Sequence, residues 1–286
     1  MTGIKNALLH LRLNYNFFIL SAPFFLGAIF VSHVENLSIF IGAFLLIYIF
    51  LFGGANIYNS YFDKDAGPIG GLEHPPKVER WMYYTSWALQ IIGLIIATTV
   101  SSRFGLVFLF SILLFWLYSS PTFRFKGKPL LSFLIIGVGT VFNTTLLGYF
   151  MAGGNRFPSQ LIISAIGACF LILSMYPVSQ AYQIDEDSHR GDVTFAVKYG
   201  IKGIKINYLI LFPLGTILLS YSFLFEQFLA ISSFLIGCIA YVFIWQKVKS
   251  ISGKQSEYKS IMRLKYFGGV TFTAAMVGLL LLINIT

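Results

Sequence analysis

Residues 37–59 read LSIFIGAFLLIYIFLFGGANIYN, an apolar run without a charged side chain. A helix needs about 20 such residues to cross the hydrocarbon core of a bilayer, so this segment predicts a transmembrane helix. The rest of the chain repeats the pattern, with short polar segments between the runs. The other candidate spans lie at about 14–33, 81–101, 104–120, 130–152, 160–182, 203–223, 226–246 and 264–285. We therefore predict an all-α, polytopic membrane protein with nine transmembrane helices.

The composition agrees with a membrane protein and excludes a soluble globule. Of the 286 residues, 57% are hydrophobic and 11% are charged, and the mean hydropathy is +0.77. A soluble domain carries roughly twice that fraction of charge. Cys169 and Cys238 both lie in apolar runs, which excludes a disulfide scaffold and a cysteine-based metal site. No soluble domain is left over, so we expect residues 1–286 to form a single transmembrane domain.

The basic residues lie mainly in the short segments between the spans. If the N-terminus is placed in the cytoplasm, every Lys and Arg except Arg103 and Arg156 falls on the inside. This asymmetry predicts a cytoplasmic N-terminus and a C-terminus outside. The formal charge of +9 therefore reflects topology and not a nucleic-acid-binding face. We expect an integral, multi-pass protein of a prokaryotic cell (inner) membrane, with its first span retained and not removed as a leader.

Polar side chains gather at the inner ends of two spans. At the end of 37–59, Asn56, Asn59 and Asp63 lie on one helical stripe, and Asp65 follows. Amide and carboxylate oxygens at this spacing suit Mg²⁺, which keeps several waters and shares its coordination shell with a substrate phosphate. The alternative for this cluster alone is a solvated helix end that is acidic without a function.

A second acidic cluster follows the span 160–182. Gln183 and Asp187 are one turn apart on one helical face, and Asp185 lies between them. Two acidic clusters on the same membrane side would repel each other unless a cation lies between them, which favours a metal–phosphate site. Cations for a phosphate are available nearby, although each could equally be a topogenic charge or a lipid anchor. They are Lys77, Arg80, Arg124, Lys126 and Arg190.

These residues resemble motifs of the UbiA superfamily of intramembrane prenyltransferases. Asn59 and Asp63 are similar to the family's first motif, N-x-x-x-D-x-x-x-D, with Gly67 in place of its last Asp. Asp187, with Gly191 and Thr194, is similar to the second motif, D-x-x-x-D-x-x-x-G-x-x-T, and Gln183 replaces its first Asp. Residues 118–129, YSSPTFRFKGKP, are similar to the family's Y-S-x-P-P-x-R-L-K-x-x-P loop. The resemblance covers nearly the whole chain.

The resemblance implies a UbiA-type bundle that transfers a prenyl or polyprenyl group from its diphosphate to a lipophilic acceptor within the membrane, with Mg²⁺ as cofactor. Relatives use acceptors such as quinone precursors, prenylglycerol phosphates and carotenoids. The implied catalytic residues are Asn59, Asp63 and Asp187. The implied metal ligands are these three with Asp65, Gln183 and Asp185. The implied substrate contacts are Asn56, Lys77, Arg80, Arg124, Lys126 and Arg190. The expected partners are the two substrates and the lipid bilayer, without nucleic acid or an obligate protein partner.

Three other functions fit the pattern less well. The main alternative is a cation-coupled membrane transporter with acidic ion sites at the cytoplasmic helix ends, since intramembrane acidic groups often mark ion paths. Against it, the carboxylates lie on one side only and leave no charged relay across the bilayer. A membrane phosphotransferase of the CDP-alcohol type would need a D-G-x-x-A-R motif, which this sequence lacks. A structural scaffold gives no reason for two acidic clusters on the same side.

Overall fold

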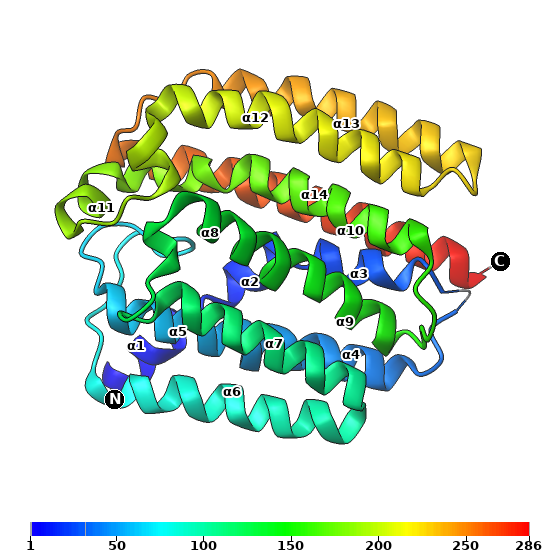
Figure 1. Ribbon diagram of the computed structural model, residues 1–286, viewed down its shortest axis with the longest axis horizontal. Coiled ribbons are helices and arrows are strands. Elements are labelled where there is room, and N and C mark those ends of the chain that lie inside the picture. The colour runs from blue at the N-terminus through cyan, green and yellow to red at the C-terminus, as the bar shows by residue number, and fades with distance from the viewer. Residues whose placement is uncertain (1, 32, 286) are drawn as a thin grey trace.

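The chain folds into a bundle of helices that run along one common direction in the computed structural model (Figure 1). The structure describes residues 2–31 and 33–285, and no strand is present in these ranges. Residue 32, inside the predicted span 14–33, lies outside the described residues, as do residues 1 and 286. Helix α1 (Thr2–His10) begins at one end of the bundle, and α14 (Tyr258–Ile285) finishes at the opposite end (Figure 1).

Eight helical segments in the described ranges are long and apolar enough to cross a membrane. They correspond to the predicted spans from 37–59 onward, so the all-α membrane fold is confirmed and the count of nine is not. Several passes join two or more consecutive elements. The elements are α4 (Leu37–Leu46), η1 (Ile47–Leu51), α5 (Phe52–Asp63), α6 (Arg80–Val100), α7 (Ser102–Ser119), η2 (Phe125–Gly127), α8 (Pro129–Ile135), η3 (Ile136–Phe142), α9 (Asn143–Met151), α10 (Ser159–Met175), η4 (Pro177–Gln183), α11 (Ile184–Arg190), α12 (Phe195–Ser222), α13 (Gln227–Val248) and η5 (Gln255–Glu257) before α14.

The predicted span 14–33 does not form one continuous helix. It is divided between α2 (Leu13–Ile19) and α3 (Ala22–Ala28), which follow α1 across the bundle (Figure 1). Arg12 before α2 has a positive φ of 51°, and Pro23 lies in the first turn of α3, where proline can begin a helix but not continue one. Because each piece has only 7 residues, neither piece is long enough to cross a bilayer alone.

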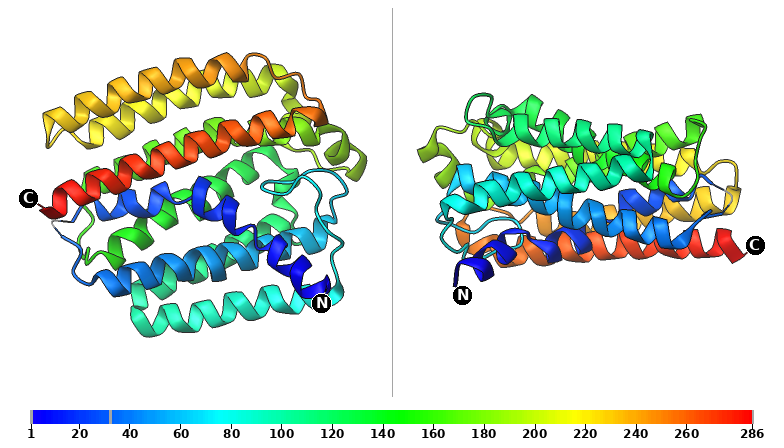
Figure 2. Two further views of the ribbon diagram at one scale, coloured as in Figure 1. Left: turned by 180° about the vertical axis from the view of Figure 1, so that it is seen from behind. Right: turned by 90° about the horizontal axis from the view of Figure 1, so that it is seen from below.

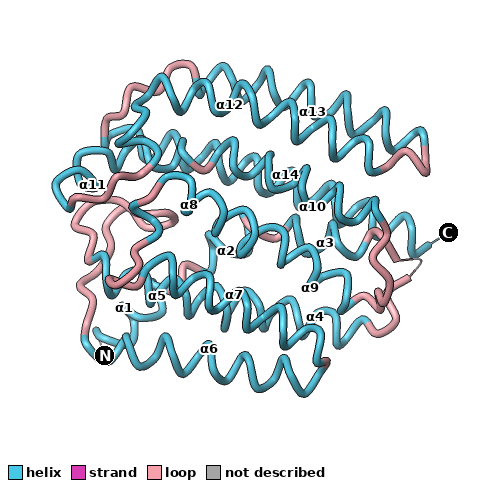
Figure 3. Tube along the Cα trace, viewed as in Figure 1, coloured by secondary structure: helices cyan, strands magenta, loops and turns pink. Residues whose placement is uncertain are grey.

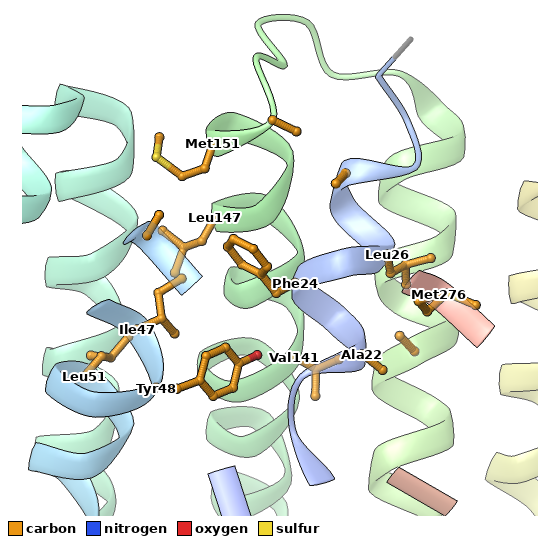
Figure 4. Packing of buried hydrophobic residues seen from close by; sticks show 14 of the residues in the cluster. Ala22, Phe24, Leu26, Ile47, Tyr48, Leu51, Val141, Leu147, Met151 and Met276 are labelled. Carbon is orange, nitrogen blue, oxygen red and sulfur yellow. The ribbon is translucent and has the colours of Figure 1, made fainter. Parts of the chain in front are cut away.

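Side chains of neighbouring helices bind the main-chain carbonyls that these breaks expose. The Tyr48 hydroxyl donates to the Leu20 carbonyl at 2.9 Å, and the amides of Asn16 and Asn56 each donate to the Leu11 carbonyl at 3.1 Å. An unpaired carbonyl inside a bilayer is costly, so these hydrogen bonds are what allow the helix to break there. Figure 4 shows the Tyr48 hydroxyl directed toward the chain that leads into α3.

Helices α3 and α9 cross at very short range in the middle of the main apolar core. Gly27 meets the backbone of Thr145 and Gly148 meets the backbone of Phe24, so closely that a Cβ on either glycine would overlap a carbonyl oxygen. Small residues allow this kind of backbone approach between helices in lipid. The Phe24 side chain is completely buried in the same core, beside Leu147 of α9 (Figure 4).

Three of the longer passes contain an irregular turn. The turns η1 and η3 are π-helical, and α12 is interrupted at Gly200, where φ is 62°. A π-helical turn changes which side chains face the interior, and such turns often lie beside functional sites. Here η3 brings Ile136 and Thr140 to the wall of the central cavity.

The loops gather at the two ends of the bundle (Figure 3). The connections that follow α5, α7 and α11 all lie at the same end, together with α11 itself (Figure 3). On the back face, α14 packs along α2 and α3 (Figure 2). The polar segments 64–79, 120–128 and 191–194 are thereby brought together at one end of the molecule.

A cavity of about 940 Å³ extends through the bundle from this polar end. Its wall includes Asp63 and Asp187 at one end and Leu279 of α14 far from them. Helix α13 packs on α12, whereas α14 packs on α2 and α3, and side chains of both α13 and α14 line the cavity, which continues as a cleft between these two helices. Ile236 of α13 and Phe272 of α14 line this cleft. The cavity therefore combines a charged end with a long apolar wall.

Candidate functional site

The end of α5 presents an amide and a carboxylate to the cavity. Asn59 and Asp63 lie on one helical face, and Nδ2 of Asn59 donates to Oδ2 of Asp63 at 2.7 Å and to Oγ of Ser119 at 3.2 Å. Asp63 is 8% exposed, and its Oδ1 is shielded from solvent without a hydrogen-bond partner. The helix ends here because Lys64 takes the left-handed conformation, with φ of 49°. Asp65, directly after this turn, also lines the cavity.

Asp187 reaches the same cavity from the second acidic segment. The turn η4 ends the pass that begins with α10, and α11 follows, so that Gln183 and Asp187 both line the cavity. Asp187 is buried and accepts a hydrogen bond from Oγ1 of Thr194 at 3.2 Å. The Gln183 amide turns to the loop after α5, where it donates to the Pro68 carbonyl at 3.1 Å. The two acidic clusters therefore meet at one end of one cavity.

A buried lysine lies beside both acidic segments. Lys126 in η2 is 7% exposed, and its Nζ is 2.6 Å from Oδ2 of Asp63 and 3.4 Å from Oδ2 of Asp192. Arg124 makes two hydrogen bonds to Asp192, at 2.6 and 2.8 Å, and its Nη2 is 3.5 Å from Oδ1 of Asp63. The mutual repulsion of the carboxylates is thus reduced by side chains of the loop 120–128.

Arg190 connects the acidic residues of different segments. Its Nη2 is 2.6 Å from Oδ1 of Asp65 and 3.3 Å from Oε1 of Glu186. Its Nη1 is 3.8 Å from a carboxylate oxygen of Asp63 and of Asp192, and no hydrogen bond satisfies this nitrogen. One guanidinium therefore fixes the end of α5 and the loop after it relative to α11, and still has a donor available for a ligand.

Glu186 holds the loop after α5 against α11. Its carboxylate accepts hydrogen bonds from the main-chain N–H groups of Ala66 at 2.8 Å and Gly67 at 3.2 Å. A Cβ at Gly67 would be 2.6 Å from Oε2 of Glu186, so a larger residue would force the carboxylate to move. An Asp there would also repel it. Glycine therefore lets Glu186 keep both of these hydrogen bonds at the position where the first motif of the resembled family ends in Asp.

The structure brings some of the predicted site residues together and leaves others outside. Lys77, Arg80 and Asp185 are exposed, and none of them lines the cavity. Asn56 lines it, but the Asn56 amide donates to Leu11 and Asn16 at the break before α2. Arg124 and Arg190 do not line the cavity, but each forms ion pairs with the acidic residues at its polar end. The predicted residues on the cavity wall are Asn56, Asn59, Asp63, Asp65, Lys126, Gln183 and Asp187.

The sequence interpretation missed several polar residues of this region. Asp192 and Glu186 lie in the same acidic segment as Asp185 and Asp187, so the acidic character that points to those two residues also points to them. Arg12 and Lys265 also line the cavity, but in the sequence they cannot be told from the other positive-inside charges. Only the folded arrangement separates them from the surface lysines.

The carboxyl group of Asp192, which pairs with Arg124, makes the stability of the fold depend on pH. Burial alone would raise the pKa of the Asp192 carboxyl, but the hydrogen bonds from Arg124 and the charge of Lys126 outweigh burial and lower it. A carboxyl whose pKa is lower in the folded protein stabilises the fold above its unfolded pKa of about 3.9. The stabilisation disappears as the pH falls through the folded-state value.

We expect Asp192→Asn to lower the free energy of unfolding at pH 7 by about 2 kcal/mol, because Arg124 loses a charged hydrogen-bond acceptor. The cost stays below that of a fully buried pair, since the Arg124 side chain is 25% exposed. Thermal unfolding of the wild type and the variant in detergent, between pH 3 and pH 7, measures this difference in stability. The gap between variant and wild type should close below about pH 4; a constant gap would show that the ion pair is not its cause.

The oxygen donors at this end of the cavity fit a magnesium ion. Asp63 and Asp187 offer carboxylates, Asn59 and Gln183 offer amide oxygens, and Oδ1 of Asp63 is buried without a hydrogen bond. In the part of the chain that the structure describes, no three Asp, Glu, His or Cys side chains form a metal-binding cluster. An ion here would therefore complete its shell with amides, water and phosphate, as Mg²⁺ commonly does.

Comparison with known proteins gives a family match over most of the chain. The model of the UbiA prenyltransferase family matches residues 20–267. Over 169 residues the chain is 31% identical to a protein of Methanosarcina mazei named digeranylgeranylglyceryl phosphate synthase. This match covers 56% of the chain and 55% of that relative, so the chain spans about half the length of the relative it matches.

Solved structures of the same family have this fold. A UbiA homolog from Archaeoglobus fulgidus bound to GPP and Mg²⁺ superposes with a TM-score of 0.71 and covers 94% of this chain and 99% of its own, at 17% identity. The same homolog bound to DMAPP and Mg²⁺ has a TM-score of 0.69 and covers 93% of this chain and 99% of its own, also at 17% identity. At this identity the likeness shows the fold alone.

Proposed function

Because this chain belongs to the UbiA prenyltransferase family, we propose that it transfers a prenyl or polyprenyl group from its diphosphate to a lipophilic acceptor within the membrane. The observation that carries the proposal is the meeting of Asp63 and Asp187 at the charged end of a long apolar cavity. Such a cavity suits a substrate with an anionic head and an isoprenoid tail. The GPP and Mg²⁺ bound by the Archaeoglobus fulgidus homolog support the same class of substrate.

In the proposed reaction the allylic C–O bond of the prenyl diphosphate breaks, and both electrons leave with the diphosphate. The allylic carbon forms a bond to a nucleophilic atom of the acceptor, and the proton that the acceptor loses passes to the released diphosphate. Bound Mg²⁺ supplies positive charge that stabilises the leaving diphosphate. We assign Asn59, Asp63 and Asp187 to holding this ion, with Asp65 and Gln183 in support.

The cations of the site have a separate task in this proposal. Arg124, Lys126 and Arg190 bind the diphosphate oxygens, where charge develops as the C–O bond breaks. Lys126 can exchange its contact with Asp63 for a phosphate oxygen, because a lysine side chain is long and flexible. The Nη1 of Arg190, which makes no hydrogen bond, offers a further donor. These interactions are strong because the site is shielded from water.

The apolar part of the cavity holds the prenyl tail in this proposal. Phe115, Tyr118 and Tyr176 line its wall near the acidic end, and the hydroxyls of the two tyrosines are 2.9 Å apart. Aromatic faces can stabilise a passing allylic cation, while the surrounding wall keeps water from capturing it. We also propose that residues 1–286 act as one transmembrane domain, with the N-terminus cytoplasmic and the C-terminus outside a prokaryotic cell membrane.

The proposal is tested by incubating the purified protein with labelled prenyl diphosphates of increasing chain length, Mg²⁺ and a membrane lipid extract, and by identifying the product by mass. We expect a prenylated lipid and free diphosphate, and no product when EDTA removes the metal ion. Uptake of a solute into proteoliposomes without consumption of any prenyl diphosphate would instead support the transporter alternative and overturn the proposal.

A further inference from the structure

The chain's own cations already cover the carboxylate of Asp63. Nζ of Lys126 is 2.6 Å from Oδ2, and Nδ2 of Asn59 donates to the same oxygen at 2.7 Å. The other oxygen, Oδ1, lies 3.5 Å from Nη2 of Arg124 and 3.8 Å from Nη1 of Arg190. Each oxygen that could bind a metal ion therefore faces a positive charge that belongs to the protein itself.

The neighbouring carboxylates are compensated in the same way. Oδ1 of Asp65 is 2.6 Å from Nη2 of Arg190, and Arg12 also acts electrostatically on Asp65. The carboxylate of Asp192 accepts two hydrogen bonds from Arg124, at 2.6 and 2.8 Å. Most of the negative charge at this end of the cavity thus has a positive partner within the chain.

Asp187 differs from the other acidic residues of the cavity wall. Over the stretch of chain that the structure describes, no cation forms an ion pair with it, although the charges of Lys126 and Arg190 act on it from farther away. Mg²⁺ gives up its water reluctantly and is usually held by one or two carboxylates together with phosphate oxygens. Without a substrate, the wall offers such an ion only one readily available carboxylate.

Lys126 and a metal ion cannot both bind Oδ2 of Asp63. Mg²⁺ binds oxygen at about 2.0–2.1 Å, so an ion there would lie close to the ammonium group. Lys126 is 7% exposed, and in a shielded site two positive charges at short range repel each other strongly. The ammonium group must therefore leave Asp63 before the ion can bind, and it needs another negative partner to do so.

A diphosphate supplies that partner. We propose that Lys126 holds the place of the metal ion on Asp63 in the free protein, so that the ion binds Asp63 only together with a diphosphate. The ammonium group moves to a phosphate oxygen, and Asp63 is then free to hold the ion with Asp187. This inference rests on the proposed function and deepens it, because it couples the binding of the ion to that of the substrate. By linkage, each ligand then raises the affinity of the other.

Lys126→Met should change two affinities in opposite directions. Without diphosphate, we expect the variant to bind Mn²⁺ about tenfold more tightly than the wild type, because Asp63 has lost its competing cation. In EDTA, without any metal ion, it should bind inorganic pyrophosphate about tenfold more weakly, because a charged hydrogen bond is lost. Electron paramagnetic resonance measures free Mn²⁺, and titration calorimetry measures pyrophosphate binding. A lysine with a purely structural role would weaken both affinities when removed.

Two further variants show whether the gain in Mn²⁺ affinity acts through Asp63. In the double variant Asp63→Asn/Lys126→Met, the gain should disappear, because no carboxylate is freed. Lys128→Met is the matched control in the same loop. Lys128 is exposed, and its ammonium group lies 5.1 Å from the centre of the Phe125 ring. This control should keep both wild-type affinities. A gain that persists in the double variant would show that the lysine does not compete with an ion on Asp63.

The wild-type protein provides a test that needs no variant. Mn²⁺ is titrated with and without farnesyl thiodiphosphate, an unreactive analogue, and mixtures without protein correct for the ion that the analogue binds in solution. We expect the analogue to tighten Mn²⁺ binding to the protein by about tenfold or more, within the usual range of coupling between two sites. Equal Mn²⁺ affinity with and without the analogue would overturn the proposal, even if Lys126→Met does not fold.

The transfer assay separates failure of this inference from failure of the proposed function. If product forms but the wild type binds Mn²⁺ as tightly as Lys126→Met does, Lys126 does not hold the place of the ion and prenyl transfer stands. If neither pyrophosphate nor the analogue binds and no product forms, the proposed function fails. The Mn²⁺ affinities of the wild type and Lys126→Met then still decide whether this lysine competes with a metal ion.

Discussion

Asp63→Asn is expected to lower kcat for prenyl transfer by about 10²- to 10³-fold, the size of effect seen when one preorganised electrostatic contact is lost from an active site. Asn keeps the size of Asp63 but removes the buried charge that faces the cavity beside Asn59. A neutral amide oxygen is a poorer ligand for Mg²⁺ than a carboxylate. Labelled product formed per unit time, at saturating Mg²⁺ and prenyl diphosphate, measures the loss.

The fold should survive this change, because Lys126 keeps Asp192 at 3.4 Å as a counter-charge. Insertion into the membrane and the elution volume in detergent are therefore expected to match the wild type. Glu73→Gln is the matched control, since Glu73 pairs with Lys259 on the partly exposed loop surface away from the cavity. Near-normal turnover of Asp63→Asn would show that Asp63 at the end of α5 does not hold the metal–diphosphate complex.

The long spans were predictable because they depend on length and apolarity alone. Every pass from 37–59 onward appears as a helix, since a chain in lipid must satisfy its backbone internally wherever it crosses. The broken first pass was not predictable. Its carbonyls at Leu11 and Leu20 are bound by Asn56 and Tyr48, residues tens of positions away in the sequence. Pro23 was the only local sign of a break, and proline is compatible with a continuous membrane helix.

The candidate site was predictable to the extent that it lies on helices. Asn59 and Asp63 share a face by helical spacing, and Gln183 and Asp187 do so as well, and all four line the cavity. Their roles as metal or substrate ligands stay predictions. Lys77, Arg80 and Asp185 lie near these residues in the sequence but are exposed in the structure. Asp185 is two residues from Asp187 in α11, a spacing that places the two on different sides of one helix. Arg80 begins α6 and Lys77 lies in the loop before it, where no helical periodicity shared with α5 indicates a direction.

Gly148→Leu is expected to prevent formation of the folded bundle. The α3–α9 crossing brings the Cα of Gly148 so near to the Phe24 carbonyl oxygen that even one added carbon would overlap it. Backbone atoms cannot rotate away as a side-chain tip can, so the helices must separate and open the core around Phe24. The cost should reach or exceed the upper end of the roughly 1–3 kcal/mol typical of overpacking.

Gly42→Ala provides the comparison, because nothing lies within 4 Å of a Cβ at Gly42 in α4. That variant should melt at or slightly above the wild-type temperature, since alanine favours helix more than glycine. Gly148→Ala should melt several degrees lower, and Gly148→Leu should yield little monodisperse protein in detergent. If Gly148→Ala and Gly42→Ala behaved alike, the two helices could not be packed backbone to backbone. The broken first pass would then need another anchor, since its short helices have no span of their own to hold them in the bilayer.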